Sequence, residues 1–419
     1  MEILHKTRKL GDRLGAGLIT GAADDDPSGI ATYSQGGAQF GGGLLWTLVL
    51  TTPLMIGIQM VSARLGWITG KGLAANIQQV MPRWVGIVLV ALLVFANTLN
   101  IAADIAAMGE ALQLIVGGGE HGHALVFGVI CAVLPLWLNF DAMVRVLKWL
   151  TLALFAYVAV ALMMQVDWHT VGVESVSALR TGGGDYWMMV VAVLGTTISP
   201  YLFFWQAAQE AEMRQRNADS EEVVNSPLFT REHLFRIKLD TVIGMGFSNV
   251  IAFCIMLAAA MAFHQHGITD IQTSRQAALA LEPIAGHFAF LLFALGVIGT
   301  GMLAVPVLAG SAAYAVAEVL NWKAGLDHHY TEAKGFYSVL VAATVIGTLM
   351  DFTNLDPIRA LVWSAVVNGV IAVPIMVVMM LLGSNRAVLG DAVLTPRHRL
   401  LGWAAVGVMA VAVVAMVLG

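Results

Sequence analysis

Long apolar stretches, separated by short polar or Gly/Pro-rich segments, recur along the whole chain. Many of them reach the roughly 20 residues that a helix needs to cross about 30 Å of hydrocarbon. They lack the alternation of apolar and polar residues that is typical of outer-membrane barrel strands. The pattern therefore predicts an all-α integral membrane protein with about eleven transmembrane helices. Their expected ranges are 13–40, 43–68, 83–117, 124–141, 146–167, 185–213, 236–263, 286–320, 336–352, 357–383 and 398–418.

The composition agrees with a membrane protein. The 419-residue chain is 58% hydrophobic and 12% charged, and its mean hydropathy of +0.78 exceeds what the surface of a water-soluble domain tolerates. The one extended hydrophilic stretch, about 214–235, is too short to form a domain, and no nucleotide-binding loop occurs in the sequence. We expect a single transmembrane domain over 1–419, and any transport must use ion gradients.

The positions of the basic residues predict the orientation. Lys and Arg collect in cytoplasmic segments of membrane proteins. With the N-terminus inside, 19 of the 22 Lys and Arg residues fall on the cytoplasmic side, and Arg180, Arg275 and Arg359 remain outside. We therefore expect a multi-pass protein of the inner membrane with an external C-terminus. The bilayer is its main environment, a monomer is expected, and no nucleic-acid partner is indicated.

The first apolar stretch is interrupted by three aspartates and a proline. Each carboxylate at the centre of a bilayer costs roughly 2.5 to 3.5 kcal/mol, so three in a row must face a polar cavity or an ion. This segment is therefore a candidate cation site. The candidate ligands are Asp24, Asp25, Asp26, Ser28 and Gly29.

The sixth stretch has a matching interruption around Pro200. A proline removes a backbone donor, and the carbonyls released at mid-membrane depth need a partner such as a cation. Breaks five helices apart predict inverted five-helix repeats, at about 13–167 and 185–383, followed by an extra helix at about 398–418. Alternatively, the two prolines only kink their helices, and the aspartates lie in an inner loop. The candidate ligands of this break are Thr196, Thr197, Ser199 and Tyr201.

Several further motifs resemble one family. They include Arg64-Leu65-Gly66, the segment 69–74, the segment 101–106 and Ser248-Asn249-Val250. Together with the first break, they resemble the Nramp family of divalent-metal transporters over most of the chain. The resemblance implies the fold of the amino-acid transporter LeuT. It also implies that a divalent metal cation is the transported substrate and that no cofactor is needed.

The chain departs from the usual family pattern at the site. Typical Nramps read Asp-Pro-Gly-Asn in the first helix and Met-Pro-His in the sixth, whereas Gly29 here replaces the Asn and Ser199 replaces the Met. Oxygen ligands suit Mg²⁺, Ca²⁺ and Mn²⁺, whereas sulfur favours softer ions. The resemblance is therefore closer to the Nramp-related magnesium transporters. Mg²⁺ is favoured, with Mn²⁺ as a further cargo, and a proton-coupled Mn²⁺/Fe²⁺ carrier is the alternative.

The sequence carries few acids and histidines at the positions that would form a proton pathway. Proton-coupled members of the family carry acids on the third helix and histidines on the sixth; here Asp104 is kept, but Asn97, Tyr201 and Gln206 stand at such positions. We expect transport to be weakly coupled to protons or uncoupled. Asp104 alternatively supports packing as a buried acid, and the amides Asn249 and Asn368 either line the ion path or join helices. The polar series Gln206, Gln209, Glu210 and Glu212 is expected to form a solvated face.

Two other functions compete with metal transport. An intramembrane hydrolase would need a second acid or a His-Glu-x-x-His motif on another span, and neither appears in the sequence, so no enzyme is expected. A sodium-coupled carrier of an organic solute would use the same fold. Its broken helices would bind a carboxylate and would not carry three acids beside the break.

Overall fold

The computed structural model describes residues 16–137, 152–164, 166–216, 227–282, 286–326, 328–353 and 356–419, and these ranges contain helices and no strands. The first half comprises α1 (Ala16–Asp24), α2 (Pro27–Phe40), α3 (Leu45–Thr69), α4 (Leu73–Val80), α5 (Arg83–Val116), α6 (Glu120–Trp137), α8 (Phe155–Met163) and α9 (Trp168–Thr181). The second half comprises α10 (Gly184–Thr197), α11 (Pro200–Arg216), α13 (Pro227–Ala262), α14 (Ser274–Ala278), α16 (Ala289–Leu320), α17 (Lys334–Met350), α18 (Pro357–Ser384), α19 (Arg386–Leu389) and α20 (Pro396–Leu418).

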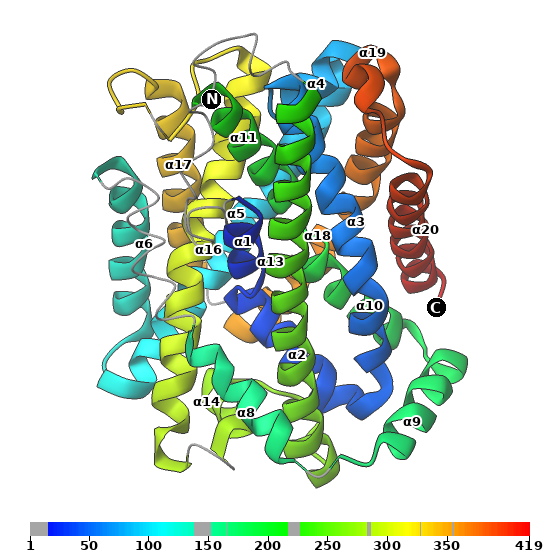
Figure 1. Ribbon diagram of the computed structural model, residues 1–419. Coiled ribbons are helices and arrows are strands. Elements are labelled where there is room, and N and C mark those ends of the chain that lie inside the picture. The colour runs from blue at the N-terminus through cyan, green and yellow to red at the C-terminus, as the bar shows by residue number, and fades with distance from the viewer. Residues whose placement is uncertain are drawn as a thin grey trace, which may run out of the picture.

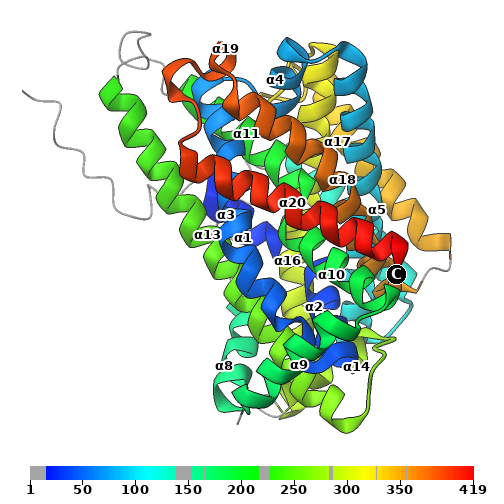
Figure 2. The same ribbon diagram turned by 90° about the vertical axis from the view of Figure 1, so that its right-hand side faces the viewer.

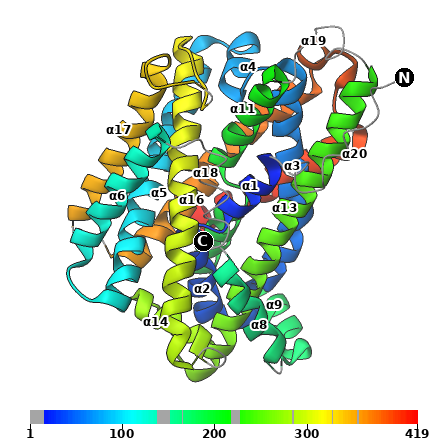
Figure 3. The same cartoon turned by 60° about the vertical axis from the view of Figure 1, so that its left-hand side comes forward.

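Long helices stand side by side in a bundle. The short helices α4 and α19 lie at one end of the bundle, and α8, α9 and α14 lie at the other (Figures 1 and 3). The last helix, α20, runs obliquely across the side of the bundle (Figure 2). We call the two ends the α4 end and the α9 end.

The predicted membrane spans are mostly present. Eight helices of the described ranges are long and apolar enough to cross a membrane, or nine when the bent pair α8 and α9 counts as one span. One of the eight, Pro27–Thr69, has 43 residues and would be about 64 Å long if straight, roughly twice the hydrocarbon thickness. It contains α2 and α3, and the chain reverses between them at Gly41, whose positive φ of 57° suits glycine. The helix α17 is shorter than the other spans but apolar.

Both predicted helix breaks are present, and the sequence explains them locally. The first helix ends at Asp24 and resumes at Pro27, and the sixth ends at Thr197 and resumes at Pro200. Each proline stands at the start of the second half-helix, where its missing N–H costs nothing. Asp26 caps α2, because its side chain accepts a hydrogen bond from the Gly29 N–H.

Small residues bring the broken helices close to their neighbours. A Cβ at Gly21 would overlap the backbone of Gly244, so α1 and α13 touch through their main chains. A Cβ at Gly195 would overlap the backbone of Ala365 and Gly369, which brings α10 equally close to α18. Such contacts are typical of packing between membrane helices. They hold both breaks inside the bundle.

Several expected boundaries were wrong. The helix α13 begins at Pro227 rather than at about residue 236, and α11 continues to Arg216, so much of the expected hydrophilic stretch 214–235 is helical. The helix α9 lies where a connection was expected, and it is bent by 107° from α8. The ends of the expected spans 124–141 and 146–167 that fall within 138–151 lie outside the described residues. The division into two inverted repeats stays a prediction.

Candidate metal centre

The three aspartates are buried in the bundle, with exposures of 1% for Asp24, 3% for Asp25 and 2% for Asp26. Asp26 is anchored through both carboxylate oxygens. Its Oδ1 accepts from the Gly29 N–H at 2.7 Å, and its Oδ2 accepts from Asn100 Nδ2 of α5 at 2.9 Å. Among the described residues, no Lys or Arg forms an ion pair with any of the three. Buried negative charge of this kind calls for a cation.

Asp24 and Asp25 face a different helix. Ser248 Oγ of α13 donates to Asp24 Oδ2 at 2.6 Å and lies 3.1 Å from Asp25 Oδ1. Asp24 Oδ1 is buried and has no hydrogen-bond partner within the described part of the chain. Within the triplet, Asp26 therefore faces α5, and Asp24 and Asp25 face α13.

The two breaks meet, as predicted. A Cβ at Gly29 would lie 3.2 Å from Thr196 Oγ1 and 3.3 Å from the Asp24 carbonyl oxygen. Tyr201 Oη, on the first turn of α11, donates to the Ala23 carbonyl at 2.8 Å. The end of α1 is thus fastened to the start of α11.

The hydroxyls of the sixth helix bond back to their own helix. Ser199 Oγ lies 2.7 Å from the Gly195 carbonyl oxygen and 2.9 Å from that of Thr196, and Thr197 Oγ1 donates to the Val193 carbonyl at 2.9 Å. The Ser199 hydroxyl thereby reaches two carbonyls of the last turn of α10, where helical partners run out. The proton of each hydroxyl is used there, and the oxygen lone pairs remain as acceptors.

Ser28 points away from the sixth helix. Its Oγ donates to the Leu361 carbonyl of α18 at 3.0 Å and lies 3.1 Å from Ser364 Oγ. Among the described residues, no three His, Cys, Asp or Glu side chains converge as a metal-holding group. A bound ion would need carboxylate oxygen from the first break together with carbonyl, hydroxyl or water oxygen, and the predicted ligand set stays a prediction.

The predicted path residues fall into two groups. Asp104 lies beside the aspartates, because Asn100 Nδ2 also approaches its Oδ2 at 3.3 Å. Asn97 and Asn249 join helices: Asn97 donates to Ser311 Oγ of α16 at 2.7 Å, and Asn249 donates to the Leu48 carbonyl of α3 at 2.5 Å. Asn368 is buried in α18.

Gln206 and the polar series that follows it are not a solvated face, contrary to expectation. Gln206 accepts from Gln59 Nε2 at 2.6 Å and donates to Thr241 Oγ1 at 3.0 Å. Glu210 is fully buried, and Glu212 Oε1 accepts from Tyr314 Oη at 2.6 Å. The prediction failed because α3 and α16 pack against α11, and side chains of α13 reach Gln206 and Glu210.

Two residues of the centre were missed. Asn100 bridges Asp26 and Asp104, and Ser364 Oγ lies 2.8 Å from Asn100 Oδ1. A signal for Asn100 existed, because Asn97, Asn100 and Asp104 follow one another at helical spacing and therefore lie on one face of α5. Nothing in the sequence around Ser364 distinguishes it from other small polar residues of membrane helices.

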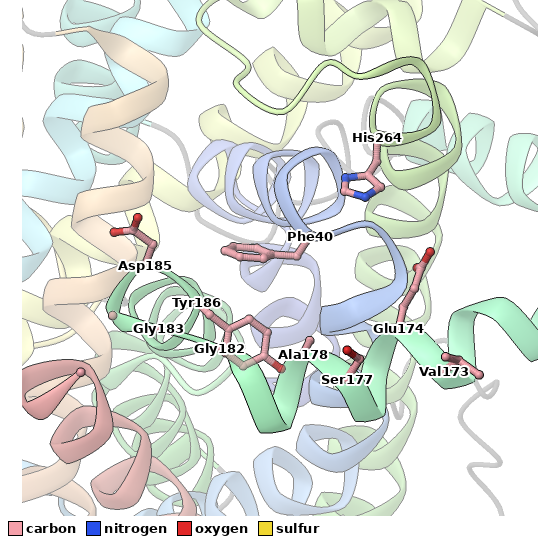
Figure 4. Close-up of a pocket in the computed structure, with 12 residues that line it drawn as sticks. Phe40, Val173, Glu174, Ser177, Ala178, Gly182, Gly183, Asp185, Tyr186 and His264 are labelled. Carbon is pink, nitrogen blue, oxygen red and sulfur yellow. The ribbon is translucent and has the colours of Figure 1, made fainter.

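A hollow lies at the α9 end, away from the aspartates. It has a volume of about 720 Å³ and lies between the end of α2, α9 and the start of α10. Figure 4 shows Glu174 and His264 on one side of it and Asp185 on the other. The predicted ligands do not line it. Glu174 Oε2 accepts from the Gly42 N–H at 2.7 Å, so α9 is fastened to the turn after α2.

The fold and the pair of broken helices define a helical membrane transporter with the LeuT-like fold. The structure resembles a mutant form of a manganese transporter of Eremococcus coleocola with a TM-score of 0.76, at 17% identity over 98% of this chain and 88% of that chain. It also resembles MhsT in complex with L-phenylalanine, with a TM-score of 0.61 at 13% identity over 96% and 98% of the two chains. At these identities the likeness shows the fold alone.

The sequence comparisons show the family. The Nramp model, described as natural resistance-associated macrophage protein-like, matches residues 17–419, and the chain belongs to this family. Its relatives include the divalent metal cation transporter MntH of Klebsiella pneumoniae, 26% identical over 94% of this chain and 91% of the relative. The MntH of Deinococcus radiodurans is 27% identical over 96% and 88%. Nramp proteins are metal transporters and not enzymes.

Proposed function

We propose that this chain carries divalent metal cations across the membrane, with Mg²⁺ as the cargo and Mn²⁺ as a further substrate. One observation carries the proposal: three buried carboxylates stand where two broken helices meet, and their described partners are neutral. Uncompensated buried carboxylates are costly, so the site is poised for a cation. The relatives named divalent metal cation transporter agree with this class of substrate.

The choice of Mg²⁺ depends on the chemistry of the ligands. Ser199 supplies a hydroxyl where typical Nramps have a thioether, and Gly29 leaves room where they have an amide. Mg²⁺ is usually held by one or two carboxylates and keeps several waters. Asp26 with one neighbouring aspartate, a hydroxyl and waters would match that preference.

A second candidate is Mn²⁺ transport coupled to protons. The solved relative from Eremococcus coleocola is named a manganese transporter. Asp104 is kept and is linked to Asp26 through Asn100, so a proton acceptor stands beside the cation site. The two candidates differ in cargo and coupling, and both use Asp26.

The remaining features complete the proposal. Transport is uptake into the cell through the inner membrane by a monomer whose N-terminus is cytoplasmic. It is weakly coupled to protons or uncoupled, because histidines are missing from the positions where proton-coupled members carry them. The membrane potential alone contributes about 4.6 kcal/mol per divalent ion at about 100 mV.

The test is uptake into proteoliposomes that contain a pH-sensitive dye. Mg²⁺ and Mn²⁺ are added outside at a fixed potential, and the chain is compared with Asp26→Ala and with Asp391→Asn, an exposed carboxylate at the α4 end that serves as control. Mg²⁺ uptake without acidification, lost in Asp26→Ala and kept in Asp391→Asn, is expected. Mn²⁺ uptake with acidification of the lumen would favour the second candidate. Absence of uptake of both ions would overturn the proposal.

A further inference from the structure

Buried polar contacts continue from the aspartates toward the α4 end, between α1, α11 and α13. These three helices lie close together in the bundle (Figure 3). Ser248 of α13 holds Asp24 and Asp25, and further along, Thr241 of the same helix accepts from Gln206 of α11. Gln206, Thr241, Glu210 and Asp240 are buried, and the Arg236 side chain is 16% exposed. A polar strip therefore leads away from the site inside the protein.

The strip ends in a cluster of three charged side chains, Glu210, Arg236 and Asp240, which we call the inner cluster. Arg236 Nη2 lies 2.5 Å from Glu210 Oε2, and Arg236 Nη1 lies 4.0 Å from Asp240 Oδ2. Glu210 has a side-chain exposure of 0% and Asp240 of 1%. Two buried carboxylates thus share one guanidinium, and the cluster carries one net negative charge.

The inner cluster lies a short distance from the aspartate triplet. Asp240 Oδ2 accepts from the Gly17 N–H at 2.8 Å. Gly17 is seven residues before Asp24 on α1, which corresponds to about 10 Å along a helix. The interval between Asp240 and Ser248 on α13 corresponds to about 12 Å. Both intervals place the inner cluster at a similar distance from the aspartate triplet along the helices, on the side toward the α4 end.

One carboxylate oxygen of the cluster is unused. Glu210 Oε1 is buried and has no hydrogen-bond partner within the described part of the chain. A buried carboxylate oxygen without a partner is costly, and a cation would satisfy it. Gln206, one turn before Glu210 on α11, and Thr241, directly after Asp240 on α13, carry further oxygen atoms close to the carboxylates.

Arg236 also contacts an aromatic ring beside the inner cluster. While it is paired with Glu210, its guanidinium carbon lies 5.9 Å from the centre of the Trp67 ring, within the range of a cation–π interaction. Trp67 is therefore a neighbour toward which the long Arg236 side chain can turn when an ion approaches the carboxylates.

We propose that Glu210 and Asp240 form a second divalent-cation site on the inner side of the aspartate triplet, and that the Arg236 guanidinium occupies it as a tethered substitute cation. An ion leaving the triplet displaces Arg236 toward Trp67 and is held by the two carboxylates before release at the α4 end. The proposal takes its ion class from the proposed function. The competing explanation is a buried ion pair that only closes the bundle, as buried pairs do elsewhere.

The decisive experiment removes the tethered cation. Purified full-length chain and the variant Arg236→Met are dialysed against Mn²⁺, and bound Mn²⁺ per chain is counted by mass spectrometry of the metal. Arg236→Met should bind one Mn²⁺ more than the original chain, and the double variant Arg236→Met/Glu210→Gln should lose that additional ion. A count that Arg236→Met leaves unchanged would overturn the second site.

The first site is followed separately with Asp26→Asn. Loss of one Mn²⁺ in Asp26→Asn reports on the triplet, and the gain in Arg236→Met reports on the inner cluster, so failure of one proposal is distinguishable from failure of the other. The additional ion should persist in Arg236→Met/Asp26→Asn. If that double variant loses it, the ion belongs to the triplet, and the second site is refuted.

If Arg236→Met does not fold, a transport measurement tests the second site instead. Asp240→Asn keeps an oxygen that accepts from the Gly17 N–H but removes the charge that would hold the ion. Its maximal Mn²⁺ uptake rate should fall roughly tenfold at unchanged KM, in the range seen when residues that support metal sites are changed. An unaltered maximal rate would show that Asp240 only fastens α1 to α13, and would overturn the proposal.

Discussion

The two helix breaks look alike along the sequence but differ in what their side chains do. At the first break, Asp24 and Asp26 reach out to α13 and α5. At the second, the hydroxyls of Thr197 and Ser199 bond back to carbonyls of their own helix. The first break brings negative charge and is anchored on neighbouring helices. The second break is neutral, and its Thr197 and Ser199 hydroxyls stay on their own helix.

This difference suggests how an ion would be held. Under the proposed function, carboxylate from the first break would supply the charge, and the second break would supply hydroxyl oxygen and leave room for water. Such unequal sharing suits an ion that keeps part of its hydration shell. If the second break instead supplied a strong ligand, the selectivity would shift toward softer ions. Four substitutions test this comparison.

The largest effect on uptake is expected from removing the charge at the first break. Asp26→Asn keeps the shape and the oxygen that accepts from the Gly29 N–H but removes the charge. Uptake of Mg²⁺ and Mn²⁺ should fall by more than about 100-fold, beyond the loss typical of residues that only support a metal site. Initial uptake rates in proteoliposomes measure it. If Asp26→Asn keeps a tenth of the original rate, the first break does not supply the essential charge.

The sequence predicted the parts of this centre that depend on local chemistry. A capping residue followed by a proline, as in Asp26-Pro27 and Ser199-Pro200, favours the start of a new helix, so both breaks were predictable. The bond between Asn100 and Asp26 joins residues far apart in the chain, and no local pattern reports it. Helical periodicity predicts the face of α5 on which Asn100 lies, but it does not predict that Asp26 is the partner of Asn100.

The inner cluster shows a second limit of the sequence. Glu210 follows a polar run near the end of a span, which is typical of a solvated helix end. Arg236 was expected at the very start of its helix, but α13 begins at Pro227 and carries Arg236 within the helix, across from Glu210. An error in one helix boundary therefore hid a buried ion pair.

The next effect tests the anchoring of the first break. Asn100→Leu keeps the branched shape but removes both donated hydrogen bonds, to Asp26 and to Asp104. Uptake should fall roughly 10- to 100-fold, because residues that orient a metal ligand have effects of this size. Thr98→Val on the same helix is the control, since Thr98 bonds to the Val94 carbonyl of its own helix. Equal uptake by Asn100→Leu and the original chain would contradict the anchoring role.

The selectivity of the second break can be changed directly. Ser199→Met restores the thioether of typical Nramps, and inhibition of uptake by Cd²⁺ should strengthen about tenfold, equivalent to about 1.4 kcal/mol. Mg²⁺ uptake should weaken at the same time. Competition between Mn²⁺ and Cd²⁺ in proteoliposomes measures the change, with Thr197→Val as a control that loses a hydroxyl without adding sulfur. An unchanged Cd²⁺ affinity would place residue 199 outside the ion's reach.

The smallest effect concerns the bond that fastens the two breaks together. Tyr201→Phe removes the hydroxyl that donates to the buried Ala23 carbonyl, and stability should fall by about 1 kcal/mol. Thermal unfolding of the purified protein measures this loss. Tyr157→Phe is the matched control, because the Tyr157 hydroxyl is buried without a hydrogen-bond partner in the described ranges, and its removal should leave stability equal or higher. If the Tyr201 hydroxyl only fastens the two breaks together, the order of preference among Mg²⁺, Mn²⁺ and Cd²⁺ should stay the same in Tyr201→Phe. A changed order would make Tyr201 an ion ligand, and the second break would then contribute more to selectivity than its neutral, self-bonded hydroxyls indicate.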